Sequence, residues 1–541
     1  MKPVTLYPLT KRDLKCGEKA DNMKETIIIR GGTVIDGTGR PGYRADVEVC
    51  EGKIAAIGDL SGRSAGHILD AGGLTVAPGF IDAHAHSDTS FLKDDSGASK
   101  LYQGITTEVS GNCGSSPFPA AEGRLEEGEW RCASFEDFLE RYEKEGYRMA
   151  VSQAMLVGHG SLRECVAGPA DRPVTAAELE QMQRLLRRDL EAGAWGLSLG
   201  LEYAPGCFAD QQEINALARV VGEYDGIITC HMRSEGLYIE DAVNELLEAG
   251  RVSGAKVQVS HLKIDNFRVH GKAPLVWQML EDARAEGIRV AADMYPYTAS
   301  CTTLTIRCPK WSLDGGDEAL LAFLQGPGRQ EVIEGIRTHY FNAERAETCL
   351  FSDDGGLWPE IVGKTLRVVA EEMLGTSDYA EAAAEVLLRT RAKAWCIFFV
   401  MDEQDMLYFL SRDVNIGTDS RAMPGDPARV KIRPHPRAYG AVAEFFSLVR
   451  EKGFCTLEEA VRRVTGKTAE RFGMTGRGIL GVGNTADITV FDPETIASRA
   501  GYLDSVRLAV GVQHVIVNGG IALENGVQTD RRCGQFLRKR I

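Results

Sequence analysis

The sequence lacks the features of a secreted, membrane or nucleic-acid-binding protein. No apolar run approaches the roughly 18 residues that a membrane-spanning helix requires. The 13 cysteines include no CxxC pair, and no secretory n-region and h-region stand at the start, so a disulfide framework is not expected. Basic residues are outnumbered, 62 against 77 acidic, and the net charge of −15 opposes nucleic acid or an anionic membrane as a partner. We therefore expect a cytoplasmic protein with reduced thiols.

The two ends of the chain share a β character that its middle lacks. Residues 1–24 are polar and without periodicity, and we expect a tail whose presence in the native protein is open. Short β segments with turn punctuation follow, such as Thr26–Arg30, and similar segments recur near the other end, such as Val512–Val517. Because chain termini often lie close together, we predict that residues 25–73 and 478–541 form one small β-sandwich.

Between these ends, over residues 74–477, short apolar strands alternate with amphipathic helices, the pattern of βα units in a parallel sheet. Eight such units favour a closed (β/α)8 TIM barrel over an open sheet. The interval from Tyr297 to Val414 exceeds one crossover, so we predict a lid insertion at about 300–350. The strand candidates are Leu74–His86, Gly104–Val109, Val151–Gly158, Gly193–Gly200, Gly226–Met232, Lys256–Leu262, Ile288–Tyr295 and Val414–Thr418.

Polar side chains recur at the C-terminal ends of these strands, where a barrel carries its reacting groups. His84 and His86 end the first strand, and their i, i+2 spacing directs both imidazoles to one face. The ends of later strands add Cys113, His231, His261 and Asp419. Thiolate, imidazole and carboxylate together suit zinc, which commonly takes three protein ligands and leaves one position for water. The sequence therefore predicts a zinc site.

The run Pro78-Gly79-Phe80-Ile81-Asp82-Ala83-His84-Ala85-His86 resembles the amidohydrolase superfamily and, more closely, the N-acyl-D-amino acid deacylases, or D-aminoacylases. Gly111-Asn112-Cys113-Gly114 and His435-Pro436-Arg437 are the segments more specific to the deacylases. The resemblance covers about residues 26 to 525. It implies a distorted (β/α)8 barrel with a small β-sandwich, and zinc-dependent hydrolysis of N-acyl-D-amino acids to a carboxylate and a free D-amino acid.

The resemblance also implies roles for single residues. Cys113, His231 and His261 would hold a tight zinc, the cysteine standing where many relatives use a carboxylated lysine. A second, weaker metal position would use His84, His86, Asp419 and the shared Cys113. Asp419 would act as general base toward the metal-bound water and then as acid toward the leaving nitrogen.

A substrate of this kind carries a free carboxylate, which an acidic protein must bind with local cations. Lys263 lies two residues beyond His261 on the same face, and Arg437 offers a planar fork for bidentate binding. Tyr295 and Tyr203 are candidates to donate phenolic hydrogen bonds. His159 and Arg233 are candidates to orient metal ligands rather than to bind metal or substrate.

Three other readings stay open. A purine or cytosine deaminase places a glutamate three residues after its fifth-strand histidine, where this chain has Ser234, with Glu235 one residue late. A hydantoinase-like or dihydropyrimidinase-like cyclic amide hydrolase normally uses a bridging lysine, and the predicted fourth strand contains none. A non-catalytic binding barrel would be expected to have lost ligands. The preferred side chain and acyl group, one or two metals, and the oligomeric state are not specified by the sequence.

Overall fold

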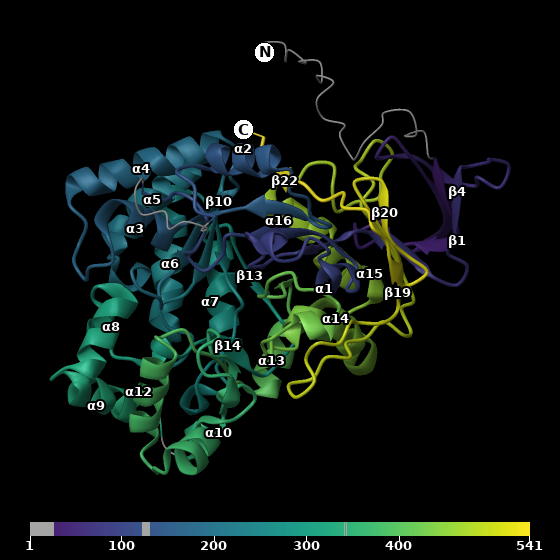
Figure 1. The fold of residues 1–541 in the computed structure, drawn as a ribbon. Helices are drawn as coiled ribbons and strands as arrows, with labels where there is room; N and C mark the ends of the chain where they lie inside the picture. Colours follow the sequence, from purple (N-terminus) through teal and green to yellow (C-terminus); the bar gives the residue numbers. More distant parts are fainter. Residues whose placement is uncertain (1–25, 122–129, 340, 342, 541) are drawn as a thin grey trace.

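The computed structural model describes residues 26–121, 130–339, 341 and 343–540, and the predicted tail at 1–24 lies outside the described residues. The strands form four sheets, of nine, six, four and three strands. In Figure 1 the largest sheet stands at one side, and the remaining strands lie among the helices. Within the described residues, no helix is long and apolar enough to cross a membrane.

Both ends of the described chain build the nine-stranded sheet, in the order β21-β20-β19-β18-β5-β1-β2-β3, with β4 beside β1. Antiparallel pairing of β18 with β5 joins the two ends, and purple and yellow strands accordingly lie side by side in Figure 1. Buried aliphatic side chains such as Ile29, Val47 and Ile516 pack into one cluster. The strands are β1 (Ile27–Val34), β2 (Tyr43–Cys50), β3 (Lys53–Gly58), β4 (His67–Asp70), β5 (Thr75–Pro78), β18 (Ile488–Phe491), β19 (Val512–Val517), β20 (Gly520–Glu524) and β21 (Val527–Gln528).

Two parallel sheets occupy the middle of the molecule, in the orders β22-β8-β7-β6 and β17-β13-β12-β11-β10-β9. Nearly all of their residues are buried, as expected for parallel strands covered on both faces. A hydrogen bond from Trp195 N, just before β10, to Met155 O of β8 and a parallel bridge between Ala85 and Ser420 connect the two sheets at both margins. The strands are β6 (Phe80–Asp82), β7 (Ile105–Ser110), β8 (Ser152–Met155), β9 (Val157–Gly158), β10 (Gly196–Gly200), β11 (Ile227–His231), β12 (Lys256–Val259), β13 (Val290–Met294), β17 (Asn415–Ile416) and β22 (Phe536–Leu537).

The predicted strand Leu74–His86 is in fact two strands in two sheets. β5 belongs to the nine-stranded sheet and β6 to a parallel sheet, and the chain changes sheet at Gly79. A Cβ at Gly79 would lie 2.2 Å from Thr106 Oγ1, so only glycine fits this crossing. The other seven candidates each overlap an observed parallel strand. β22 pairs with β8, which takes residues 536–537 away from the nine-stranded sheet.

Helices follow the parallel strands and cover them, and α4, α5 and α6 lie next to one another. The helix α4 begins with a capping box, in which Thr175 and Glu178 satisfy each other's backbone amides. The helices of this part are α1 (Ala98–Leu101), α2 (Phe135–Glu145), α3 (His159–Ala167), α4 (Ala176–Glu191), α5 (Gln211–Glu223), α6 (Ile239–Ser253), α7 (Ala273–Ala285), α13 (Glu403–Leu410), α14 (Arg437–Lys452), α15 (Leu457–Arg463) and α16 (Gly466–Phe472).

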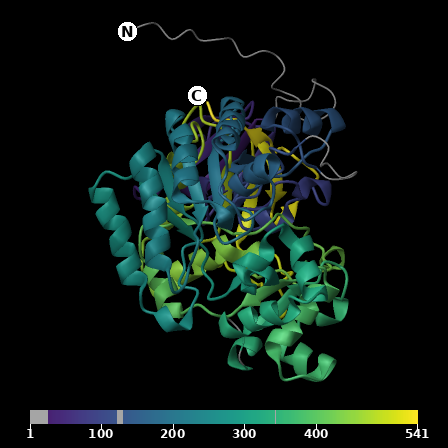
Figure 2. The ribbon, with the colours of Figure 1, turned by 90° about the vertical axis from the view of Figure 1, so that its left-hand side faces the viewer.

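The insertion is longer than the predicted 300–350 and runs from Ser300 to Phe398. It has its own three-stranded sheet, β14-β16-β15, and its own buried cluster around Leu304, Leu320 and Phe351. It lies below the parallel strands in both views (Figure 1; Figure 2). Its elements are β14 (Ser300–Thr303), α8 (Gly316–Gln325), α9 (Arg329–His339), α10 (Ala343–Glu347), β15 (Cys349–Asp353), α11 (Leu366–Val368), α12 (Tyr379–Arg389) and β16 (Trp395–Phe398).

Candidate active site and metal centre

A cavity of about 900 Å³ opens at the C-terminal ends of the parallel strands. Residues of the insertion, including Thr302 and Trp395, complete its wall. His84 is fully buried beside the cavity. The other predicted site residues all line it: His86, Cys113, Tyr203, His231, His261, Lys263, Tyr295, Asp419 and Arg437. The structure thus brings together side chains that the sequence distributes over seven strand ends and one helix.

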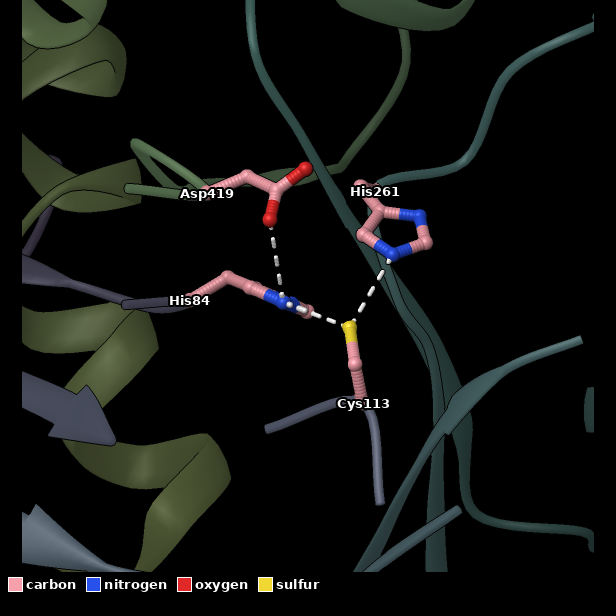
Figure 3. A group of neighbouring side chains, drawn as sticks. All are labelled: His84, Cys113, His261 and Asp419. Carbon is pink, nitrogen blue, oxygen red and sulfur yellow. Dashed lines mark hydrogen bonds and ion pairs between the residues drawn. The ribbon is translucent and has the colours of Figure 1, made fainter. Parts of the chain in front are cut away.

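Four candidate ligands converge at the floor of the cavity (Figure 3). The Cys113 Sγ atom lies 3.4 Å from His84 Nε2 and 3.3 Å from His261 Nε2, and His84 Nε2 lies 3.6 Å from an oxygen of Asp419. All four donor atoms lie within 4.8 Å of one another. Sulfur, nitrogen and oxygen donors gathered in this way form a donor set that suits zinc.

The two remaining histidines flank this group on opposite sides. His231 Nδ1 lies 3.0 Å from His261 Nε2, which places it with the predicted tight ligands. His86 Nε2 lies 3.0 Å from Asp419 Oδ1, on the side of the predicted second position. His231 thus lies beside a predicted tight ligand and His86 beside a predicted ligand of the second position, while His261 shares one cluster with His84, Cys113 and Asp419.

Backbone strain is concentrated at the candidate ligands. Cys113, His261 and Asp419 have positive φ angles of 53°, 35° and 46°, in the left-handed region that side chains other than glycine rarely adopt. Such conformations cost about 1–3 kcal/mol each and persist only where the surroundings enforce them. A Cβ at Gly200 would lie 2.1 Å from the Cys113 carbonyl oxygen, so this glycine lets the cysteine turn approach β10. Strain and close approach together aim the thiol at the histidines.

His84, His231 and His261 each contact a carboxylate with the ring nitrogen that faces away from the other ligands. Such outer partners fix the tautomer and the ring orientation of a metal-ligating histidine. No sequence motif marks these acids as site residues, although each lies at or within four residues of a strand end. The contacts are His84 Nδ1 to Asp293 at 3.1 Å, His231 Nε2 to Glu202 at 2.9 Å and His261 Nδ1 to Glu235 at 2.9 Å.

Charge sets the protonation state of the two reactive groups. Burial alone would raise the pKa of Asp419, but Arg437, His261 and the hydrogen bond from His86 hold that pKa well below its usual range. Burial likewise opposes ionisation of Cys113, yet His261 and His84 lower the pKa of the thiol well below its ordinary value. The surroundings therefore favour the anionic form of both groups, which is the form that binds a metal or accepts a proton.

Two cations flank the buried phenol of Tyr295. The Arg437 guanidinium lies 4.5 Å and the Lys263 ammonium 5.9 Å from its ring centre. The Tyr295 hydroxyl is buried and has no hydrogen-bond partner among the described residues. Arg437 pairs with Asp419 Oδ2 at 2.9 Å, and Lys263 with Glu235 at 2.6 Å. A phenolic donor between two cations is an arrangement that attracts a carboxylate.

The remaining predicted residues differ in their contacts. The Tyr203 hydroxyl lies 2.9 Å from Thr302 of the insertion, and its ring centre lies 4.6 Å from that of His231. Among the described residues, His159 and Arg233 make no hydrogen bond or ion pair to a predicted metal ligand. Their partners are Glu213 at 2.7 Å and Glu245 at 2.8 Å, so they brace α5 and α6 instead.

A fully buried charge cluster lies behind the metal-binding group. The Lys100 ammonium donates to Asp82, to the Thr418 hydroxyl and to the Ser420 carbonyl at 2.7, 2.7 and 2.9 Å. Asp82 in turn accepts from the backbone amides of His84 and Thr418. Lys100 also lies 3.2 Å from Glu108. This cluster fixes the two backbone segments that carry His84 and Asp419.

Known proteins are similar to this chain over most of its length. A model of the Amidohydrolase family matches residues 67–300 and 414–522. An N-acyl-D-glutamate deacylase of Alcaligenes xylosoxydans xylosoxydans is 36% identical, with 95% of this chain and 97% of that protein covered. A D-aminoacylase of the same organism is 34% identical, with 96% and 99% covered.

A solved structure is similar over nearly the same length. It is an N-acyl-D-glutamate deacylase from Bordetella bronchiseptica, complexed with zinc and a phosphonate inhibitor that mimics the tetrahedral intermediate of the reaction. Its TM-score is 0.81 at 34% identity, with 95% of this chain and 100% of that chain covered. The chain therefore belongs to the amidohydrolase family and, within it, to the N-acyl-D-amino acid deacylases.

Proposed function

We propose that this protein hydrolyses the amide bond of N-acyl-D-amino acids, with zinc, to a carboxylate and a free D-amino acid. The observation that carries the proposal is the juxtaposition, in one cavity, of the Cys113 ligand group with a carboxylate-attracting corner at Tyr295. The relatives named as deacylases support the same substrate class.

Cys113, His231 and His261 would hold the tight zinc. His84, His86 and Asp419, with Cys113 shared, would hold a second and weaker ion. Zinc, when bound, supplies a Lewis acid for the amide carbonyl and makes the attacking water more acidic. The lowered pKa of Cys113 fits this assignment because the thiolate is the form that binds metal.

Asp419 would move the proton. As an anion it accepts a proton from the attacking water, and it then donates that proton to the leaving amine nitrogen. Its contact with Arg437, at 2.9 Å, keeps the carboxylate charged before substrate enters. Lys263 and Arg437 would bind the substrate carboxylate, with phenolic hydrogen bonds from Tyr295 and Tyr203.

We also infer that the two parallel sheets are parts of one distorted (β/α)8 barrel. The Trp195 to Met155 hydrogen bond and the Ala85 to Ser420 bridge support closure. In this reading residues 74–477 give the hydrolase barrel except for β5, residues 25–73 with 478–541 give the β-sandwich except for β22, and the insertion acts as a lid. We expect the activity in the cytoplasm, where a ligand thiol such as Cys113 stays reduced.

The test is zinc content together with the release of free amino acid from paired panels of N-acetyl-D- and N-acetyl-L-amino acids. We expect zinc-dependent release from D substrates. Cys113→Ala should lose the tight zinc, whereas His84→Asn should keep it, because His84 belongs to the weaker position. Turnover of a cyclic amide with no release from any D substrate would contradict the proposal.

A further inference from the structure

Glu235 is a buried carboxylate that the proposed chemistry leaves without a role. It lies on the turn after β11, four residues beyond His231, and its residue is 5% exposed. Its oxygens accept from the Lys263 ammonium, with Nζ 2.7 Å from one and 2.6 Å from the other. A backbone hydrogen bond from Asp265 N to Glu235 O ties its turn to the one after β12.

The same carboxylate meets His261 on the ring edge that faces away from the other ligands. His261 Nε2 points at Cys113 Sγ and at His231, so a metal would take the lone pair of this nitrogen. The proton of the neutral ring then resides on Nδ1, which lies 2.9 Å from Glu235 Oε1. His261 Nδ1 is thereby a donor that needs an acceptor.

Two donors therefore stand next to each other. Lys263 Nζ lies only 2.8 Å from His261 Nδ1, and an ammonium has no lone pair to accept the imidazole proton. Glu235 Oε1 lies within hydrogen-bond distance of both atoms and carries the charge that offsets the ammonium. Without this carboxylate, a buried cation would face an imidazole N–H, an arrangement that is strongly unfavourable.

We propose that Glu235 is a positioning residue that couples the two halves of the site. It holds the Lys263 ammonium where a substrate carboxylate meets it, and it holds His261 in the tautomer and orientation that bind zinc. This inference rests on the proposed function for the role of Lys263, but its metal half does not depend on it. Removal of the Glu235 charge should therefore weaken substrate binding and metal binding together.

The chain offers a matched control in Glu202. Its carboxylate lies 2.9 Å from the outer nitrogen of His231, as that of Glu235 does from the outer nitrogen of His261. Among the described residues, however, Glu202 forms no ion pair with a lysine or an arginine. The substitution Glu202→Gln should therefore affect metal affinity without a specific effect on recognition of the substrate carboxylate. Lys263→Met is the converse control. It removes the cation but leaves the Glu235 carboxylate in place as the acceptor for His261 Nδ1.

The experiment uses the full chain and two readouts. Zinc affinity is measured on the apoprotein by competition with a chromogenic chelator, and KM and kcat are measured separately at saturating zinc with the best N-acetyl-D-amino acid. Glu235→Gln should weaken zinc binding about 10- to 100-fold and also raise KM more than it lowers kcat. Glu202→Gln should reproduce only the loss of zinc affinity, and Lys263→Met only the rise in KM.

The double variant Glu235→Gln/Lys263→Met decides the coupling. The KM of the double variant should not exceed that of Lys263→Met, because Glu235 acts on the substrate through the ammonium. The zinc affinity of the double variant should remain above that of Glu235→Gln, because the unpaired Lys263 cation is gone. Wild-type zinc affinity in Glu235→Gln, or full additivity of the KM effects, would overturn the inference.

A charge-retaining variant and the wild-type activity separate a positioning role of Glu235 from a purely structural one and from failure of the proposed function. Glu235→Asp retains the charge and should recover part of both effects, which a purely structural loss would not show, and it replaces Glu235→Gln if that variant does not fold. A wild-type protein that releases no amino acid from any D substrate contradicts the proposed function, whereas the zinc competition still judges the role of Glu235 at His261.

Discussion

The cavity floor and the Lys100 cluster both bury charges, but they satisfy them differently. Every proton of the Lys100 ammonium has a protein acceptor within 2.9 Å, and the side chain is completely buried. In the cavity, by contrast, the Tyr295 hydroxyl, Asp88 Oδ1 and Arg437 Nε are buried without hydrogen-bond partners among the described residues. Since unpaired buried groups are costly, they mark the places where a ligand is expected.

The comparison separates charges that hold the fold from charges that await a substrate. A fully paired cluster should matter mainly for stability, and an incompletely paired one mainly for activity. The proximity of the two makes the contrast sharp, because His84 and Asp419 receive support from the first while serving the second.

The largest expected effect is on the activity side. Asp419→Asn should lower kcat by about 10²- to 10⁴-fold, the usual contribution of a general acid or base, because an amide cannot accept the proton of the attacking water. Zinc at the tight position should be retained, which elemental analysis of the purified variant would check. A variant with near wild-type kcat would remove Asp419 from the reaction.

The next effect falls on stability. Lys100→Met should lower the free energy of unfolding by about 3–5 kcal/mol, because Asp82 would remain as a buried charge without its cation. Denaturant unfolding followed by circular dichroism measures this loss. A change below about 1 kcal/mol would show that the cluster does not hold the fold, and the distinction between the two regions would fail.

A smaller effect is expected for Tyr295→Phe, which should weaken substrate binding without a loss of stability. Tyr295→Phe removes a hydroxyl that has no partner among the described residues, so the free energy of unfolding should be unchanged or slightly higher. KM should rise about 10- to 100-fold, because a hydrogen bond to the substrate carboxylate is lost. Thr418→Val, in the paired cluster, is the contrasting variant, since its loss should appear in stability.

The smallest effect is a pH dependence within the paired cluster. Burial, together with the charge of Asp82, raises the pKa of Glu108 from 4.5 to about 7, with Lys100 opposing the shift. Between these values the folded protein keeps a proton that the unfolded chain has lost, so stability should fall as pH rises through this window. The slope from one proton cannot exceed about 1.4 kcal/mol per pH unit.

The control for this pH effect is Glu108→Gln, which cannot ionise. Its free energy of unfolding, measured between pH 5 and pH 7, should fall less steeply than that of the wild type. Equal slopes in the two proteins would mean that Glu108 does not titrate in this range.

How far the sequence predicts the site depends on the range of the contacts. His84, His86 and Cys113 were identifiable because each stands at the end of a recognisable strand, in a motif of a few residues. Glu235 was noticed only as a displaced glutamate, because its partners Lys263 and His261 come from the next strand along the chain and meet it only in the folded protein. Local pattern does not specify which acidic side chains turn inward.

The same reasoning explains the difference in the fold. The run from Leu74 to Ile81 is apolar apart from Thr75 and its Pro78-Gly79 pair, so its periodicity does not mark the change of sheet, and only this turn signal does. The insertion was underestimated because its second half contributes β16 to a sheet begun at β14, a pairing between residues almost a hundred positions apart. β22, with two residues, is too short for any pattern to predict.

The crossing at Gly79 also bears on the order in which the protein can be made. β5, one residue before β6, is held between β1 and β18, and β18 is formed by Ile488–Phe491. During synthesis the segment that carries His84 and His86 therefore emerges long before the strand that anchors it. A ribosome-bound chain cannot complete the metal-binding group before Asp419 has been translated, and β5 gains its second neighbour only after residues 488–491 have followed.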